Sequence, residues 1–160
     1  MEREWVHRIE VGVKEGFKDT VAESVKSSIE EDLGIKGIES MAFFDVYYIH
    51  MRLTESEARE VAENVLIDPI INSYSLNNES ADGFDWAIEV QLHANVTDNL
   101  GIVAKQATEE LLARKLEGEI RTARKFLLKA RISEKETRSI CTDLLANEVI
   151  ESYNVKKLGG

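Results

Sequence analysis

The chain has 160 residues, of which 43% are hydrophobic and 31% charged, a composition typical of globular proteins and unlike that of disordered chains. Its formal net charge of −10 disfavours a broad nucleic-acid interface. The single cysteine, Cys141, cannot form an internal disulfide bond, as expected in a reducing cytosol. No apolar run is long enough to cross a bilayer, and no secretory leader follows Met1. These features predict a cytoplasmic protein that binds neither nucleic acid nor membrane.

An internal repeat organises the sequence. Segments Asn64–Tyr74 and Asp143–Tyr153 read alike, and the offset between their final tyrosines is 79 residues. The same offset aligns the two halves without a gap from residue 9 to residue 76. Chance similarity between two acidic helical sequences does not account for a register that also preserves strand alternation and helix caps. The predicted organisation is two copies of one unit joined by a polar linker: residues 1–76, residues 84–160 and, for the linker, 77–83.

Each copy opens with alternating apolar and polar residues, which predicts a half-buried strand. The alternation covers Trp5–Val13 in the first copy and Trp86–His93 in the second. Asp19 and Asp98 then stand where an N-cap acceptor begins a helix. Apolar residues follow every three or four positions, which predicts an amphipathic helix in each copy.

The middle of each copy predicts a β-hairpin. Its strands are expected near Ile38–Phe43 and Tyr47–Leu53, and in the second copy near Glu119–Thr122 and Phe126–Ile132. Each hairpin is followed by a capping box of the Ser/Thr-x-x-Glu type, which predicts a second helix.

A last short strand completes each unit, near Ile71–Leu76 and Ile150–Val155. The unit is therefore β-α-β-β-α-β, of the α+β class, with an antiparallel sheet and two helices on one face. The other face of the sheet needs cover, and the second unit is the expected cover. We expect the units to pack through their sheets with pseudo-twofold symmetry, and the last strands are candidates to cross between them.

No catalytic group of residues is visible in the sequence. His7, His50 and His93 fall on separate predicted strands, whereas a metal site needs three or four convergent ligands. Cys141 lies on a predicted helix beside Ile140, which favours a small buried apolar residue over a nucleophile. Phosphate-binding glycine loops and hydrolase motifs do not occur. We therefore expect no catalytic, cofactor-binding or metal-binding residues.

Charge is divided unevenly between the two copies. Residues 1–80 carry 8 basic and 17 acidic side chains, whereas residues 81–160 carry 12 basic and 13 acidic ones. Locally, the second predicted hairpin carries a basic cluster of three residues: Arg121, Arg124 and Lys125. Because charge complementarity guides protein association, these are candidate partner-binding residues, with neutral surface drift as the alternative.

The run Leu144–Tyr153 resembles the L-L-A-N-P-V-I-E-x-Y ending of the PurS family, the small subunit of phosphoribosylformylglycinamidine synthase. The first copy repeats this ending at Val65–Tyr74 and keeps the proline that Glu148 replaces in the second copy. The resemblance covers nearly the whole chain twice. It implies ferredoxin-like units and a chain similar to a PurS dimer in one polypeptide.

The resemblance implies a role in purine biosynthesis without catalysis. Such a subunit bridges an ATP-dependent synthetase of the PurL type and a glutaminase of the PurQ type. It assists ammonia transfer while formylglycinamide ribonucleotide is converted to the amidine. The expected partners are these two subunits, with self-association of the chain left open, and no cofactor is expected. A separate subunit and a segment of a larger synthetase fit the resemblance equally.

Two other functions fit the predicted units. Tandem units of this kind also resemble ACT-type regulatory modules, which bind amino acids between units. Gly16 at the first strand–helix turn is compatible with such a module, whereas the second copy has Asn95 there. A dimeric α+β-barrel enzyme would need convergent polar residues inside a barrel, and the inward strand positions here are mostly apolar. Because a fold does not define a function, both alternatives stay open at this stage.

Overall fold

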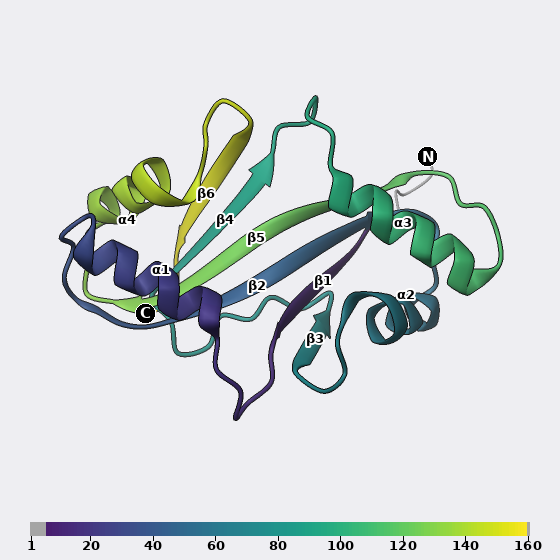
Figure 1. Cartoon of the computed structure of the whole chain (residues 1–160), viewed down its shortest axis with the longest axis horizontal. Coiled ribbons are helices and arrows are strands. Elements are labelled where there is room, and N and C mark those ends of the chain that lie inside the picture. The colour runs from purple at the N-terminus through teal and green to yellow at the C-terminus, as the bar shows by residue number, and fades with distance from the viewer. Residues whose placement is uncertain (1–5, 160) are drawn as a thin grey trace.

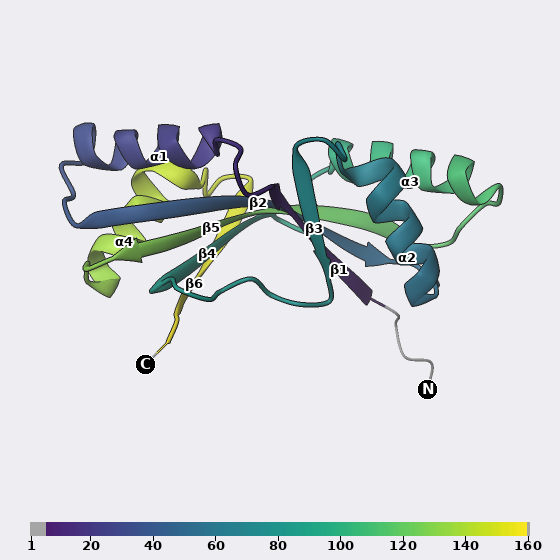
Figure 2. The ribbon, with the colours of Figure 1, turned by 90° about the horizontal axis from the view of Figure 1, so that it is seen from below.

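The computed structural model of the chain describes residues 6–159, so Trp5 of the predicted first strand lies outside the described residues. These residues form one six-stranded antiparallel sheet with the strand order β3-β1-β2-β5-β4-β6. The helices all lie on one face of the sheet, and among the described residues the segment between β3 and β4 crosses the opposite face (Figures 1 and 2).

The first copy supplies six elements: β1 (Val6–Val13), α1 (Thr20–Glu31), β2 (Ile38–His50), α2 (Glu55–Val61), a π-helical turn η1 (Ala62–Leu66) and β3 (Asn72–Leu76). The second copy supplies the equivalent six: β4 (Trp86–Leu92), α3 (Asn99–Leu112), β5 (Glu119–Ala130), α4 (Glu134–Ile140), η2 (Cys141–Leu145) and β6 (Glu151–Lys157). Both capping boxes form, at Thr54 and Ser133, and the two π-helical turns follow at equivalent positions. The predicted repeat, the α+β class and the antiparallel sheet are confirmed.

The predicted hairpin is wrong in both copies, because its two strands are one continuous strand. Strand β2 has 13 residues and β5 has 12, and they pair with each other from Ile38 opposite Ala130 to His50 opposite Glu119. Asp45 lies in the stretch between the two expected strands, yet it is paired with Arg124 in the middle of the ladder. The long neighbouring strand satisfies the backbone groups there, so no turn is needed.

The pairing of β2 with β5 also fixes the symmetry of the molecule. Asp45 and Arg124 are equivalent under the 79-residue offset, and they are directly opposite each other in the ladder. The pseudo-twofold axis therefore passes between these two residues. Figure 1 shows the result, with α1 and α3 on opposite sides of this axis and β3 and β6 at opposite edges.

The two hydrophobic cores lie between the sheet and the helices, and each contains a helix from the other copy. The core around β1, α2 and β3 includes Ala104 of α3, with Leu112 packed against it. The core around β4, α4 and β6 includes Ile29 of α1, with Val25 and Leu33 packed against it. Each long strand runs under both cores, so the first helix of each copy packs on the other half.

The elements that cross between the copies are therefore the helices α1 and α3, and not the last strands that the sequence suggested. The last strands do not cross, because β3 pairs with β1 and β6 pairs with β4 within their own copies. The sheets do not pack face to face either; they join edge to edge through β2 and β5. This arrangement leaves the inner edges of both half-sheets hydrogen-bonded, which removes the exposed edges that unpaired strands would present.

The helices α1 and α3 are tied to the long strands by their N-cap residues. Asp98 accepts hydrogen bonds from the backbone N–H of Gly101 (2.9 Å) and from that of Thr122 in β5 (2.6 Å). The equivalent Asp19 accepts from Ala22 (3.0 Å) and from Phe43 in β2 (2.9 Å). One carboxylate thus caps a helix and also satisfies a strand amide, which fixes the position of the helix over the sheet.

Gly101 allows α3 to approach β5 closely. A Cβ atom at this position would lie 1.9 Å from the carbonyl oxygen of Ile120. We expect Gly101→Ala to lower the free energy of unfolding by about 2–3 kcal/mol, because the overlap with backbone outweighs the gain in helix propensity. Urea unfolding followed by circular dichroism measures this change. Gln106→Ala, on the exposed side of the same helix, is the matched control and should change stability by less than about 0.5 kcal/mol.

Candidate functional site

The three basic residues predicted to bind partners all lie in β5, and the structure does not bring them together. Arg124 and Lys125 are neighbours in a strand, so their side chains project from opposite faces of the sheet. Arg124 Nη2 donates to Glu151 Oε2 and to the carbonyl oxygen of Leu145, both at 2.8 Å. Lys125 is buried on the face without helices.

Arg121 is half-buried and is also held by contacts within the chain. Its guanidinium donates to the carbonyl oxygens of Val96 and His93, both at 3.0 Å, and so holds the loop between β4 and α3. A role of these three residues in partner binding stays a prediction. The placement in a strand, and not at a hairpin end, means that reversing their charges would first disrupt contacts inside the chain.

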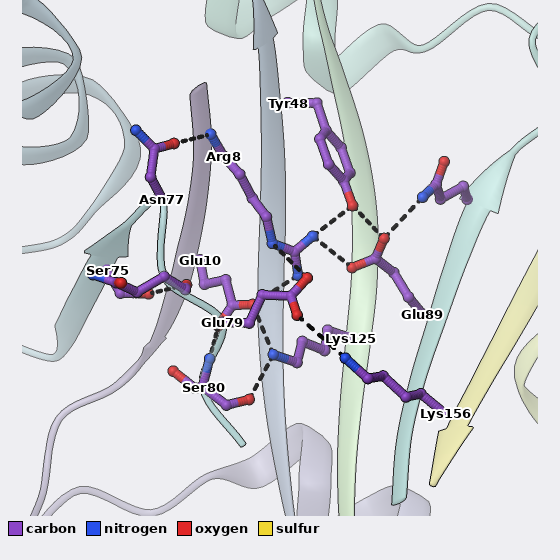
Figure 3. Close-up of polar contacts among 12 residues, drawn as sticks. Arg8, Glu10, Tyr48, Ser75, Asn77, Glu79, Ser80, Glu89, Lys125 and Lys156 are labelled. Atoms are coloured by element: carbon purple, nitrogen blue, oxygen red, sulfur yellow. Dashed lines mark hydrogen bonds and ion pairs between the residues drawn. The ribbon is translucent and has the colours of Figure 1, made fainter. Parts of the chain in front are cut away.

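The polar residues that the fold does gather lie on the face without helices, at the junction of the two copies (Figure 3). We call them the central network, and they come from four neighbouring strands: Arg8, Glu10, Tyr48, Glu89 and Lys125. Glu10 is almost completely buried, and its Oε2 accepts from Lys125 Nζ and from Arg8 Nη2, both at 2.7 Å. The Glu10–Lys125 ion pair therefore joins the first copy to the second.

Glu89 occupies the position equivalent to Glu10 in the second copy. Its carboxylate accepts from Arg8 Nη1 at 2.8 Å and from the hydroxyl of Tyr48. Arg8 thus lies between the two equivalent glutamates and binds both, and it also packs over the Tyr48 ring. Each glutamate is paired with a residue of the other copy, so the network holds the copies together as well as satisfying buried charge.

The linker between β3 and β4 is bound to this network. The backbone N–H of Ser80 donates to Glu10 Oε1 (3.0 Å), and Lys125 Nζ donates to the carbonyl oxygen of Ser80 (2.6 Å). The backbone N–H of Arg8 donates to Asn77 Oδ1 at 2.8 Å. A cavity of about 170 Å³ remains beside the linker, but Arg8 in its lining is already bonded to Glu89, and Lys125 to Glu10.

The pKa shifts in the network favour a structural role over a role in proton transfer. Burial alone would raise the pKa of Glu10, but hydrogen bonds from Lys125, Ser80 and Arg8 outweigh it and lower the pKa below its usual value. Burial and the hydrogen bond to Glu89 raise the pKa of Tyr48. Glu10 is therefore ionised and Tyr48 neutral near pH 7, and neither has a pKa poised for acid–base work at that pH.

Two further candidates for chemistry, Cys141 and His7, are buried within the fold. Burial raises the pKa of Cys141 to about 12, so the thiolate that a nucleophile requires is scarce at neutral pH. His7 is buried and bonds through Nε2 to the carbonyl oxygen of Leu53 at 2.7 Å. Between residues 6 and 159, no group of three or more His, Cys, Asp or Glu residues is placed to hold a metal ion. Over the same residues, no helix is long and apolar enough to span a membrane.

Sequence reasoning missed the central network. Arg8 and Glu10 alternate with apolar residues, which predicts a wet strand face, and nothing local indicates that a linker covers them. The available signal was Lys125, a lysine that stands where the first copy has the apolar Val46.

These observations define a class: a duplicated α+β protein whose central polar groups bind one another across the junction of its two copies. The profile of the family described as PurS, phosphoribosylformylglycinamidine (FGAM) synthase, matches residues 6–80 and again residues 85–158. The chain therefore belongs to the PurS family, in a tandem-duplicated form. Comparison with curated proteins gave no match. Family membership gives the chain a role in FGAM synthase, in purine biosynthesis, in association with subunits of that enzyme.

The contribution of the buried Glu10 carboxylate to the stability of the fold can be tested by substitution. Glu10→Gln leaves the buried ammonium of Lys125 without its counter-charge and removes one of the two carboxylates that bind Arg8, so we expect a loss of about 3 kcal/mol in unfolding free energy at pH 7. Glu89→Gln is the matched control at the equivalent position, and its effect should be smaller because the Glu89 side chain is 17% exposed. Urea titrations of the two variants and the parent chain at pH 7 measure the difference.

The Glu10→Gln variant also tests the pH dependence. Because the pKa of Glu10 is lowered from 4.5 in the folded chain, its stabilisation is fully present above pH 4.5 and is lost as the pH falls through the folded value. The stability difference between the parent chain and Glu10→Gln should therefore shrink in acid. A difference that stays constant down to pH 3 would contradict this account.

Proposed function

We propose that the chain is the non-catalytic accessory component of FGAM synthase that bridges the synthetase and glutaminase subunits in the cytoplasm and assists ammonia transfer between them. The observation that carries the proposal is the double match to the PurS family, one match in each copy. The chain acts either as a separate subunit or as a segment of a larger synthetase. Its proposed organisation is two units, residues 1–76 and 84–160, with 77–83 as the linker.

The geometry supports bridging because the two copies form a single body with two equivalent ends. The continuous β2–β5 ladder and the exchanged helices α1 and α3 join the halves firmly. The linker is held to the central network by hydrogen bonds at both Asn77 and Ser80. A rigid body with pseudo-twofold symmetry presents related surfaces at opposite edges, which is what a component that contacts two subunits requires.

The occupied junction favours bridging over ligand sensing. An ACT-type module would bind an amino acid between units, through charged groups that are free to receive it. Here Arg8, Glu89 and Lys125 at the junction are paired with one another and with Glu10. Protein contacts at the outer surface remain available to the chain, and these are sufficient for an accessory role.

An assay with two nitrogen sources tests the proposal. Purified synthetase and glutaminase subunits from the same organism are supplied with ATP and formylglycinamide ribonucleotide, with and without this chain. We expect omission of the chain to slow the glutamine-dependent reaction by about tenfold or more, because released ammonia is then diluted into bulk water. The reaction supplied directly with ammonium salt should change much less. Glutamine-dependent rates that are equal with and without the chain, at saturating subunit concentrations, would reject the bridging role.

A further inference from the structure

Several of the exposed large apolar side chains occupy equivalent positions in the two copies. We call them the apolar tips: tip one contains Val21, Ile70 and Ile71, and tip two contains Leu100, Val149 and Ile150. Each residue of tip one is related by the 79-residue offset to one of tip two. Ile70 is 71% exposed and Val149 is 84% exposed. Scattered exposed apolar residues are normal, but the same three positions recurring in both copies indicate a shared purpose.

Val21 and Leu100 lie in the first turns of α1 and α3, whereas the other four tip residues lie in the loops before β3 and β6. These two loops are held in place by the same contacts in both copies. The backbone N–H of Lys14 donates to the carbonyl oxygen of Ile71, and that of His93 donates to Ile150, each at 2.8 Å. The side chains of Lys14 and His93 also bond to the carbonyl oxygens of Pro69 and Glu148. The four loop residues of the tips are therefore presented in a fixed conformation, so little conformational entropy is lost when a partner binds.

The tips lie at opposite edges of the molecule. Figure 1 shows the loop before β3 near the β1–α1 loop at the lower edge, and the loop before β6 near the β4–α3 loop at the upper edge. In Figure 2 these loops rise on the helix side of the sheet. One chain can thus contact two protein surfaces at once, one at each edge.

We propose that the two apolar tips are the docking points for FGAM synthase subunits, each of which presents an apolar cleft with a basic rim; this inference rests on the proposed function. The negative charge of this chain is the reason for expecting a basic rim on the partner. The net charge is −10, most of it in residues 1–80, and in each copy an exposed acidic residue, Asp68 or Glu148, lies in the tip loop itself. Nearby cations are already engaged, since Lys18 pairs with Glu23 at 3.0 Å and Lys14 binds Pro69. A basic rim is attracted to this surface, whereas a second copy of the chain, also at −10, is repelled.

Two surface substitutions, Ile70→Ser and Val149→Ser, and the double variant that combines them test the proposal. Both side chains are more than two-thirds exposed, so these changes leave the fold intact. Leu111→Ser, near the C-terminal end of α3 and outside both tips, is the matched control on another exposed apolar residue. The full chain and each variant are titrated by calorimetry against purified synthetase subunit and, separately, purified glutaminase subunit. Unfolding curves are recorded in parallel.

We expect the double variant to weaken binding of at least one subunit by about tenfold or more, because truncating a buried apolar anchor removes most of its contribution. Leu111→Ser should change the affinity by less than about twofold. Each single variant should weaken binding of the subunit that docks on the tip carrying the substitution. Raising the salt concentration should slow association of the parent chain, as the basic rim requires.

The outcomes separate this inference from the function on which it rests. If the parent chain binds neither subunit, the proposed function fails and the docking assignment fails with it. If the parent chain binds but the double variant binds equally well, only the docking assignment is rejected. Sedimentation of the parent chain alone completes the test. A dimer that the tip substitutions dissociate, without any change in subunit binding, would show that a second copy occupies the tips and would also reject the assignment.

Discussion

The antiparallel pairing of β2 with β5 is the interaction on which the rest of the structure depends. Because the two long strands pair along their whole length, the two half-sheets become one sheet and neither has a free inner edge. The length of the strands also carries each copy beneath the first helix of the other, so both cores contain residues from both copies. Neither half can move independently without breaking this ladder and opening a core.

The central network adds specificity to this pairing. A buried carboxylate such as Glu10 is costly unless it is paired and hydrogen-bonded, and its partner Lys125 comes from the other copy. The linker supplies a further donor and acceptor at Ser80. The charged groups at the junction bind one another and hold the two copies together. Contacts with FGAM synthase are therefore expected at the outer edges, where apolar side chains are exposed.

Local sequence patterns predicted the repeat, the caps and the class of fold, because those features depend on nearby residues. Asp19, Thr54 and their equivalents cap helices as expected. The continuous strands and the exchanged helices were not predicted, because they depend on which segment lies beside β2. When the neighbouring strand is unknown, the polar Asp45 indicates a turn between two strands. Its pairing with Arg124 of β5 shows that it lies inside one continuous strand. The network was missed for the same reason: burial of Glu10 depends on a linker about 70 residues away.

The residues opposite each other at the axis show what joining the two copies into one polypeptide permits. If two separate, identical chains met in this way, every residue at the axis would face itself, so aspartate would meet aspartate or arginine would meet arginine. A covalently joined pair escapes that restriction, and here Asp45 faces Arg124. In the same way, Lys125 replaces the apolar Val46 of the other copy and reaches Glu10. The two copies are thus specialised toward each other at the axis, where the first supplies the acidic residue and the second the basic one.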